Sequence, residues 1–563
     1  MTDQSTDNPN FDKYKYIIKN PLTTKLLYLC GILSWFMTLW GYYNFFQLDI
    51  LYWILLFPLI LIYTIYYTLS YGINLFYVKP DLKIHLEKVK FFKESKDKPF
   101  VDIFLPICGE SIEIVRRTWD RVSKLDYPNF NVYVLDDKGK KEYEDLANFY
   151  NFNYLSRPNK GEMKKAGNLK YGFERSSGKY IVIFDADFAP LPEFLHETVP
   201  YQEEDETLGI VQTPQYFEIH DVVHKRSWLE FGACSTQEDF YRLIQCSRDY
   251  FKSAICVGTN AIYRRKALQT IGGTAQIEHS EDVWTGILLR NQGYELKYIP
   301  YILAEGFCPD EHNSFFKQQY RWCKGSMSLM TDPKFWKLPI GSWNKIPYIS
   351  GFFYYISSFV SFFLPFTVFF VLYKHYDTIS FNNSLLFLPY IVFSFIVIPL
   401  MRPHNSFKIG AYLARYSAFA AYSLAIVHTA LGINMGWSPT GNAKGNNFWY
   451  HFSIYSIFAH FVAYLGMIIF MAYIDRLNFD IPELYSVNFW IIINTIMSAL
   501  YLSSLLVNVF FEANAKWGKF VLKTFIPNIT IFAILFGYLA FAIIDSQNNS
   551  LNAKKAVAGV VSK

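Results

Sequence analysis

The chain contains 563 residues, of which 52% are hydrophobic and 19% aromatic, so its apolar fraction exceeds that of an ordinary soluble protein. The formal net charge of +5 is too small to indicate a nucleic-acid-binding protein, and the sequence has no dense basic stripe. The seven cysteines include no Cys-x-x-Cys pair, so neither a zinc site nor a disulfide framework is indicated.

Apolar segments toward both ends of the chain predict membrane-spanning helices. A helix that crosses a bilayer needs about 20 mostly apolar residues. Segments of about this length predict spans at Leu26–Phe46, Leu51–Phe76, Tyr348–Leu372, Leu386–Met401, Phe452–Tyr473, Val487–Val509 and Val521–Ile544.

One further apolar segment, Ile409–Ile433, has two interpretations. It contains Arg415 and His428 among many alanines, so it either crosses the bilayer or lies along its interface. An interfacial position keeps the N-terminal lysines and the Lys516–Lys523 cluster on the inner side, as the positive-inside rule requires. We therefore expect an interfacial helix here and a central region that lies in the cytosol.

The charged central region, residues 79–345, reads as an α/β domain because short apolar strands alternate with helical stretches. The sequence predicts apolar, buried strands at Val101–Pro106, Asn131–Leu135 and Lys179–Phe184. The second strand ends at Asp136-Asp137. Ligands of open α/β sheets gather at the carboxyl ends of strands. This pair of carboxylates is therefore placed for a nucleotide's ribose or base, or else it forms a turn with the glycine that follows.

The third predicted strand is followed by Asp185-Ala186-Asp187. Two carboxylates at this spacing reach a hard divalent cation, which would neutralise a departing diphosphate; the alternative is a solvated loop. The preceding stretches Arg157–Gly161 and Lys164–Asn168 offer cations and backbone donors to phosphates, unless their charge is simply solvated.

Two later motifs carry polar groups suited to sugar transfer. Ser280-Glu281-Asp282 opens a helical stretch, where a carboxylate either accepts a proton from a sugar hydroxyl or caps the helix. In Gln318-Gln319-Tyr320-Arg321-Trp322, Arg321 offers a planar fork of donors to a diphosphate and Trp322 offers a ring face to a sugar. The alternative for Arg321 and Trp322 is a role as anchors at the membrane edge.

Taken in chain order, these motifs resemble those of the processive branch of glycosyltransferase family 2, which includes cellulose, chitin, hyaluronan and mannan synthases. The motifs are Asp136-Asp137-Lys138-Gly139, Lys165-Ala166-Gly167-Asn168, Asp185-Ala186-Asp187, Gln212-Thr213-Pro214, Gly258-Thr259, Ser280-Glu281-Asp282 and Gln318-x-x-Arg321-Trp322. They cover about residues 100–330. The order of polar and apolar regions extends the resemblance over most of the chain.

The resemblance implies an α-helical membrane channel combined with a cytosolic α/β domain of the GT-A (Rossmann-like) type. It implies inverting transfer from a UDP-sugar with Mg²⁺ or Mn²⁺ as cofactor. The partners would be the donor, the growing polysaccharide and the lipid bilayer, with no nucleic acid, and the location would be the plasma membrane. The implied organisation is a cytosolic tail (1–25), two transmembrane helices (26–78), the GT-A domain with the Gln318–Trp322 interface helix (79–345), transmembrane helices (346–404), an interface helix and gating loop (405–449), transmembrane helices (450–545) and a short tail (546–563).

The resemblance also assigns roles to residues that match the motifs. Asp282 would be the catalytic base that deprotonates the acceptor hydroxyl, and Asp185 and Asp187 would hold the metal ion and the diphosphate. Arg321 would hold the pyrophosphate, and Trp322 would lie under the terminal sugar. The residues expected to bind substrate are Asp136, Asp137, Lys165, Asp185, Glu281, Gln318, Arg321 and Trp322.

A loop that follows the interface helix, Gly436–Gly445, resembles the gating loop of bacterial cellulose synthase. In that case Trp437, Thr440 and Lys444 would contact UDP in a closed state that excludes water. The spacing departs from the family pattern by an insertion, and the alternative is an ordinary Gly/Pro/Asn loop.

The motifs favour glucose, supplied as UDP-glucose, and leave the β-linkage open between 1,4, 1,3 and mixed. Ile255-Cys256-Val257-Gly258-Thr259 and Gln318-Gln319 depart from the usual cellulose synthase pattern. A chitin, hyaluronan or mannan synthase that uses UDP-N-acetylglucosamine or GDP-mannose is therefore the alternative. A transporter or receptor with an inactive transferase domain is the alternative of another class, and the intact carboxylates, Arg321 and Trp322 argue against it.

Overall fold

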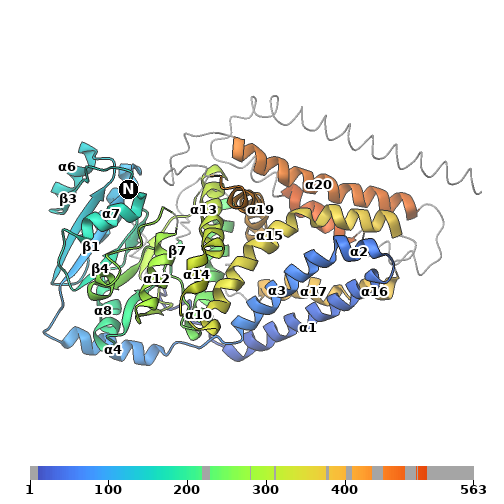
Figure 1. The fold of residues 1–563 in the computed structure, drawn as a ribbon. Coiled ribbons are helices and arrows are strands. Elements are labelled where there is room, and N and C mark those ends of the chain that lie inside the picture. The colour runs from blue at the N-terminus through green and yellow to red at the C-terminus, as the bar shows by residue number, and fades with distance from the viewer. Residues whose placement is uncertain are drawn as a thin grey trace, which may run out of the picture.

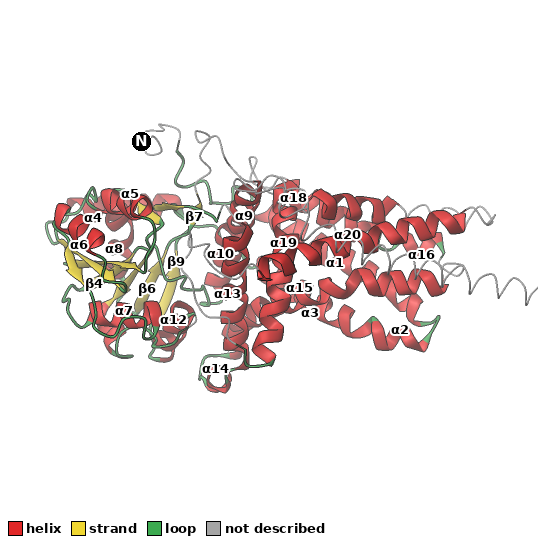
Figure 2. Ribbon diagram, turned by 90° about the horizontal axis from the view of Figure 1, so that it is seen from above, coloured by secondary structure: helices red, strands yellow, loops and turns green. Residues whose placement is uncertain are grey.

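A computed structural model describes residues 11–217, 228–278, 280–309, 312–375, 380–400, 409–433, 448–475, 490 and 492–503. These residues form an α/β domain joined to a group of long helices (Figure 1). The helix α13 (His312–Thr331) lies between the two parts in both ribbon views (Figure 2). The chain thus combines a GT-A-type α/β domain with apolar helices, as its sequence predicts.

The centre of the α/β domain is a seven-stranded mixed sheet with the order β3-β2-β1-β4-β8-β6-β9. Its strands are β1 (Val101–Ile107), β2 (Phe130–Asp136), β3 (Asn153–Leu155), β4 (Tyr180–Ile183), β6 (Leu208–Gln212), β8 (Ala261–Arg264) and β9 (Glu295–Tyr298). Strand β8 is antiparallel to β4 and β6, whereas the other neighbours are parallel. A second sheet has the order β5 (Phe188–Pro190), β10 (Ala304–Gly306), β7 (Tyr216–Phe217).

Helices cover both faces of the large sheet because its strands alternate apolar side chains between the two faces. Ile103 and Leu105 of β1 share a core with α4 (Leu82–Glu94), α5 (Ile112–Val122), α6 (Lys141–Phe149) and α8 (Phe194–Glu204). Phe104 shares the opposite core with α7 (Lys164–Phe173), α11 (Arg265–Gln269) and α12 (Glu281–Asn291). The domain also contains α9 (Trp228–Asp239), a π-helical turn at Phe240–Ile244, α10 (Gln245–Tyr250) and α14 (Pro333–Lys337).

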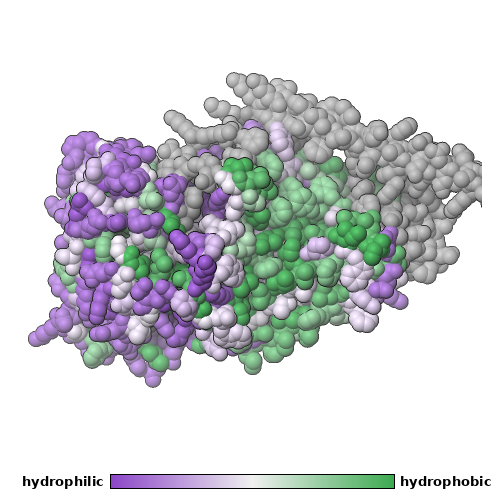
Figure 3. All heavy atoms as spheres, viewed as in Figure 1, coloured by the Kyte–Doolittle hydropathy of each residue, from purple (hydrophilic) through white to green (hydrophobic). Residues whose placement is uncertain are grey.

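The second part of the molecule consists of apolar helices whose exposed side chains are largely hydrophobic (Figure 3). They are α1 (Pro21–Phe46), α2 (Ile50–Leu55), α3 (Phe57–Asn74), α15 (Ser342–His375), α16 (Phe381–Leu385), α17 (Leu388–Val392), a π-helical turn at Phe393–Val397, α18 (Ile398–Leu400), α19 (Ile409–Ala430) and α20 (Phe448–Asp475). Among the described residues, three helices are long and apolar enough to cross a membrane: Pro21–Phe46, Ser342–Leu364 and His451–Phe470.

Two of the predicted spans are interrupted. The span expected at Leu51–Phe76 consists of α2 and α3, which meet at Leu56, just before Pro58 at the start of α3. In the span expected at Leu386–Met401, the chain breaks between α16 and α17 and then continues as α17, a π-helical turn and α18. Pro58 and Pro389 lie in the first turns of α3 and α17, and a proline disfavours helical backbone at the residue before it, which accounts for both breaks. The span predicted at Val521–Ile544 lies outside the described residues.

Helix α19 fills the space between the α/β domain and the long helices. It is seen nearly end-on beside α13 in Figure 1, whereas α15 and α20 run across the picture. Its alanines Ala411, Ala414, Ala418, Ala421 and Ala425 are almost fully buried, which lets neighbouring backbones approach closely. The interfacial position predicted for Ile409–Ile433 stays a prediction.

The N-terminal segment 11–19, expected to be part of a cytosolic tail, lies against the α/β domain. Lys13 accepts a hydrogen bond from the backbone of Ile302 (2.8 Å) and pairs with the buried carboxylate of Glu197. Tyr16 is only 3% exposed. The segment therefore connects the first apolar helix back to the domain.

Candidate active site

A set of charged side chains gathers where β4 ends. Asp185 follows this strand, and its backbone N–H donates to the Thr259 hydroxyl (2.9 Å). Lys165, at the start of α7, places its Nζ 2.5 Å from Asp185 Oδ1 and donates to the carbonyl of Gly258 (2.9 Å). One lysine therefore joins the Asp185-Ala186-Asp187 and Gly258-Thr259 segments, which lie far apart in the sequence.

Asp282 enters this set from the first turn of α12. Gly258 has a φ of +76°, and a side chain there would meet Asp282 Oδ2 at 3.1 Å. The carboxylate thus lies against the backbone of residue 258. Desolvation and the neighbouring charge of Glu281 raise the pKa of Asp282 to about 7, although Lys165 opposes the shift. Desolvation raises the pKa of Glu281 as well.

The same negative charge acts on Asp187. Desolvation and the proximity of Asp185 raise the pKa of the Asp187 carboxyl to about 7. Desolvation lowers the pKa of Lys165, but the charges of Asp185 and Glu281 outweigh this and raise it above the ordinary value. A buried carboxyl whose pKa is raised by burial and by a neighbouring carboxylate suits a divalent cation, which prefers oxygen ligands. Asp185 and Asp187 fit a metal ion on this ground.

Helix α13 contributes Arg321 from the opposite side. Desolvation lowers the pKa of Arg321, whereas the charges of Asp187 and Asp185 act in the opposite direction. The approach of α13 depends on Gly325, because a Cβ at this position would lie 1.8 Å from Ser280 Oγ. Close packing of α13 on the start of α12 therefore brings Arg321 and Asp282 to one site. The sequence motifs predict that these two residues share a site, but they do not indicate this helix contact.

The other side of α13 is bonded to α19. Tyr422 donates to Gln319 Oε1 (2.6 Å), and the Tyr320 hydroxyl lies 2.9 Å from His428 Nδ1. Gln318 and Trp322 are half-buried. Their expected contacts with substrate stay predictions.

The Asp136-Asp137 pair is held by the chain's own donors. Asp136 accepts hydrogen bonds from the backbones of Lys138 (2.7 Å) and Lys140 (2.8 Å) and from the Tyr154 hydroxyl (2.8 Å). Asp137 accepts from Arg157 Nε (2.6 Å) and from the backbone of Gly161. Arg157 is 1% exposed, so it is neither a solvated charge nor a free donor to phosphates. Both interpretations of this arginine from the sequence are wrong.

One residue of the site, Glu110, was missed from the sequence, and Gln212 was recognised as part of a motif without its role in positioning the glycine loop. Glu110 follows β1, and desolvation raises its pKa, with Asp185 acting in the same direction. The rule that ligands gather at strand ends would have found it. The Gln212 side chain bonds to the backbones of Val257 (2.9 Å) and Thr259 (2.8 Å), which positions the glycine loop. Only its partners in space reveal this role. Trp437, Thr440 and Lys444 lie outside the described residues.

Part of the chain is similar in sequence to known glycosyltransferases. Residues 102–272 match the family described as glycosyl transferase family 2. The chain is 29% identical over 261 residues to cellulose synthase 1 catalytic subunit [UDP-forming] of Komagataeibacter xylinus, covering 46% of this chain and 35% of that protein. It is 30% identical over 238 residues to the cellulose synthase catalytic subunit [UDP-forming] of Pseudomonas fluorescens (strain SBW25), covering 42% and 32%. The chain thus spans about a third of the length of these relatives.

Among solved structures, the chain is similar to the mannosyltransferase PcManGT from Pyrobaculum calidifontis in complex with GDP-Man and Mn²⁺. The sequence identity is 16% and the TM-score 0.45, and the similarity covers 66% of this chain and all of that one.

Proposed function

We propose that this protein, in which residues 102–272 form a glycosyl transferase family 2 domain, is a processive, inverting synthase of a β-glucan. It would transfer glucose from UDP-glucose in the cytosol and pass the polymer through the plasma membrane. The observation that carries the proposal is the convergence of Asp185, Asp282 and Arg321 from three different segments on one site.

The site contains the groups that inverting transfer requires. A hydroxyl of the acceptor sugar loses its proton to the Asp282 carboxylate as its oxygen forms a bond to C1 of glucose. The bond between C1 and the diphosphate breaks, and UDP leaves. A base titrating near pH 7, as Asp282 does, combines an adequate ionised fraction at neutrality with useful basicity.

Charge stabilisation of the leaving UDP would come from the opposite side of the site. Arg321 and Lys165 are the described cations beside the carboxylates, and a positioned cation stabilises charge that develops on a diphosphate. Asp185 and Asp187 would hold Mg²⁺ or Mn²⁺, which supplies Lewis-acid stabilisation of the leaving diphosphate when bound.

Passage of the polymer would use the apolar helices beside the site. Sugar rings pack on aromatic faces while their hydroxyls need polar partners. Aromatic side chains are abundant on these helices, for example Tyr354 on α15 and Tyr422 on α19, and the Tyr422 hydroxyl is bonded to Gln319 of α13. Trp322 on α13 would then support the terminal sugar at the entrance.

The test is incorporation of radiolabelled sugar by the purified full chain with Mg²⁺ or Mn²⁺. UDP-glucose, UDP-N-acetylglucosamine and GDP-mannose are supplied separately, and products are digested with linkage-specific glucanases. We expect polymer from UDP-glucose. Polymer from another donor would show that the proposed substrate is wrong, while the proposed mechanism would still apply. No polymer and no nucleotide release from any donor would favour an inactive domain.

A further inference from the structure

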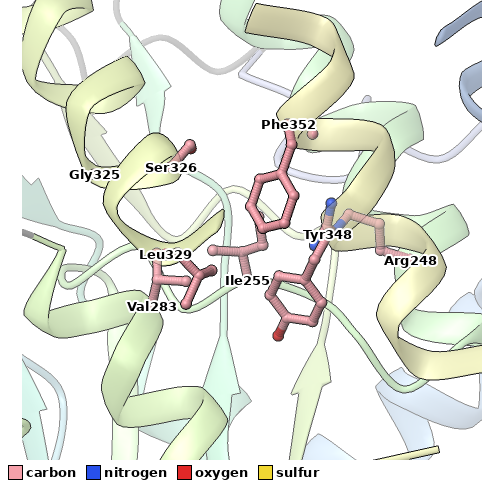
Figure 4. A pocket seen from close by; sticks show the side chains of 9 residues that line it. Arg248, Ile255, Val283, Gly325, Ser326, Leu329, Tyr348 and Phe352 are labelled. Atoms are coloured by element: carbon pink, nitrogen blue, oxygen red, sulfur yellow. The ribbon is translucent and has the colours of Figure 1, made fainter. Parts of the chain in front are cut away.

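A small cavity lies beside the site, between the α/β domain and the first turns of α15 (Figure 4). Its volume is about 50 Å³. The lining residues come from α10, α12, α13, α15 and the loop after α10: Arg248, Ile255, Val283, Gly325, Ser326, Leu329, Tyr348, Gly351 and Phe352. One charged side chain, Arg248, therefore lies in largely apolar surroundings.

Arg248 is only 3% exposed and is incompletely bonded. Its Nε donates to the carbonyl of Ser253 (2.9 Å) and its Nη1 to the carbonyl of Pro347 (2.6 Å). Its Nη2 has no hydrogen-bond partner within the described part of the chain. The carboxylate of the neighbouring residue, Asp249, does not bind Nη2 of Arg248, because it is bonded to Lys297 and to the backbone of Tyr298.

Among the described residues, the charge of Arg248 is also uncompensated. Desolvation lowers its pKa to about 10, and of the groups in the described part of the chain only Tyr348 acts in the opposite direction; its ring centroid lies 4.9 Å from the guanidinium. Burying a cation without an anion is energetically costly, and buried charges in proteins are usually paired. An oxyanion is the ligand that a guanidinium's remaining N–H groups bind best.

The size and the walls of the cavity bear on which ligand it binds. One water needs roughly 10–15 Å³ of occupied space, so the cavity has room for several waters or for one phosphate group. The Tyr348 and Phe352 rings in the wall are already packed against Arg248 and Phe335, so they do not form an open platform for a sugar.

We propose that this cavity binds one phosphate group through Nη2 of Arg248, and that the phosphate belongs to a phospholipid of the inner leaflet. Tyr348 and Gly351 lie near the start of α15, one of the helices long enough to cross a membrane. Trp336 and Trp343 nearby in sequence are 44% and 63% exposed, as is typical of side chains at the headgroup level. Basic pockets at this level recognise lipid headgroups.

A ligand bound in the cavity would influence the proposed catalytic base, Asp282, through the residues that line the cavity. Val283 lines the cavity, and its backbone N–H donates to Asp282 Oδ1 (2.8 Å). Gly325 also lines it and packs against Ser280. A bound phosphate group would therefore stabilise the conformation of the first turn of α12. The lipid would then influence Asp282 without contacting the sugar donor or the acceptor.

The test is calorimetric titration of the delipidated full chain in neutral detergent. The probes are dioctanoyl phosphatidic acid, inorganic phosphate and, as a probe without phosphate, dioctanoylglycerol. We expect saturable binding of phosphatidic acid and none of dioctanoylglycerol. Arg248→Gln should weaken the binding roughly ten- to hundredfold, as expected for loss of a charged hydrogen bond, whereas Arg290→Gln, which removes a half-buried arginine on α12, should not.

A second variant keeps Arg248 and fills the cavity. A Cβ at Gly351 meets only Arg248 Nη1, at 3.9 Å, so Gly351→Leu should fold and should weaken binding as much as Arg248→Gln. If inorganic phosphate binds in an Arg248-dependent way and phosphatidic acid does not, the cavity is a phosphate site whose ligand is a soluble phosphate and not a lipid. Binding that neither variant weakens, or no binding of either phosphate probe, would overturn the proposal. No donor is present, so the result does not depend on the proposed synthase activity.

Discussion

At the scale of single residues, the assignment of Asp282 as base has a direct test. Asp282→Asn keeps the shape of the side chain but removes the proton acceptor. Polymer synthesis should fall by about 10²–10⁴-fold, while UDP binding, measured by calorimetry, changes little. Asp145→Asn is the control, because Asp145 lies on α6 and pairs only with the exposed Lys141 in the described structure. Strong residual synthesis by Asp282→Asn would remove Asp282 from this role.

The raised pKa of Asp282 also predicts how the rate varies with pH. With the pKa near 7, the base is mostly protonated below neutrality. We expect kcat/KM to fall about tenfold for each pH unit below that value. Because the charges of Glu281 and Lys165 act on Asp282, the apparent pKa belongs to the group of residues. A rate that stays constant down to pH 5 would show that no such base limits the reaction.

At the scale of elements, the contact between α13 and α12 should determine whether the site forms. Gly325→Ala places a Cβ where the Ser280 hydroxyl lies, at 1.8 Å, and should displace Arg321 from the carboxylates. We expect synthesis to drop at least about tenfold, because small misplacements at a reacting centre are costly, with the domain still folded.

A second substitution provides the control for that effect. Ser280 has a φ of +55°, a conformation that glycine adopts without strain. Ser280→Gly removes the clashing atoms, so the double variant Ser280→Gly/Gly325→Ala should recover much of the lost synthesis. Equal activity of the wild type and Gly325→Ala in the radiolabel assay would show that the contact is not required.

The elements also show how far the sequence can be interpreted. The strands that end at Asp136 and before Asp185 were predicted correctly, because apolar runs and strand-end carboxylates are local signals. The pairing of Arg157 with Asp137 and the packing of Gly325 on Ser280 involve partners more than 15 residues apart. No local pattern reports such contacts. The prolines at the breaks in the predicted spans are visible in the sequence, but the spans were predicted from their hydropathy alone.

At the scale of the whole molecule, the N-terminal segment ties the first apolar helix to the α/β domain through one buried carboxylate. Glu197 accepts from His85 Nε2 (3.1 Å) and pairs with Lys13. Burial alone would raise the pKa of Glu197, but His85 and Lys13 outweigh it and the pKa is lowered. The charged form is therefore the stabilising one.

Glu197→Gln should for this reason lower the thermal stability of the purified protein in a pH-dependent way. Breaking a buried pair costs roughly 3–5 kcal/mol, so we expect the midpoint of unfolding to fall by on the order of 5 °C. A lowered carboxyl pKa gives stability that is present above the ordinary value of 4.5 and is lost as pH falls through the lowered one. The pKa of Lys13 is raised above 10.5, so its contribution is complete below that pH.

The wild type should therefore exceed Glu197→Gln by a constant margin between about pH 5 and 10, and the margin should vanish in acid. Glu87→Gln is the matched control, since Glu87 forms an exposed ion pair with Lys83 at 3.8 Å and such pairs contribute little. If removing residues 1–19 lowers the midpoint as much as Glu197→Gln, and the two changes together lower it no further, the carboxylate acts through this segment. Additive losses would mean that Glu197 stabilises the domain through His85 alone, and that the segment does not tie the domain to the first helix.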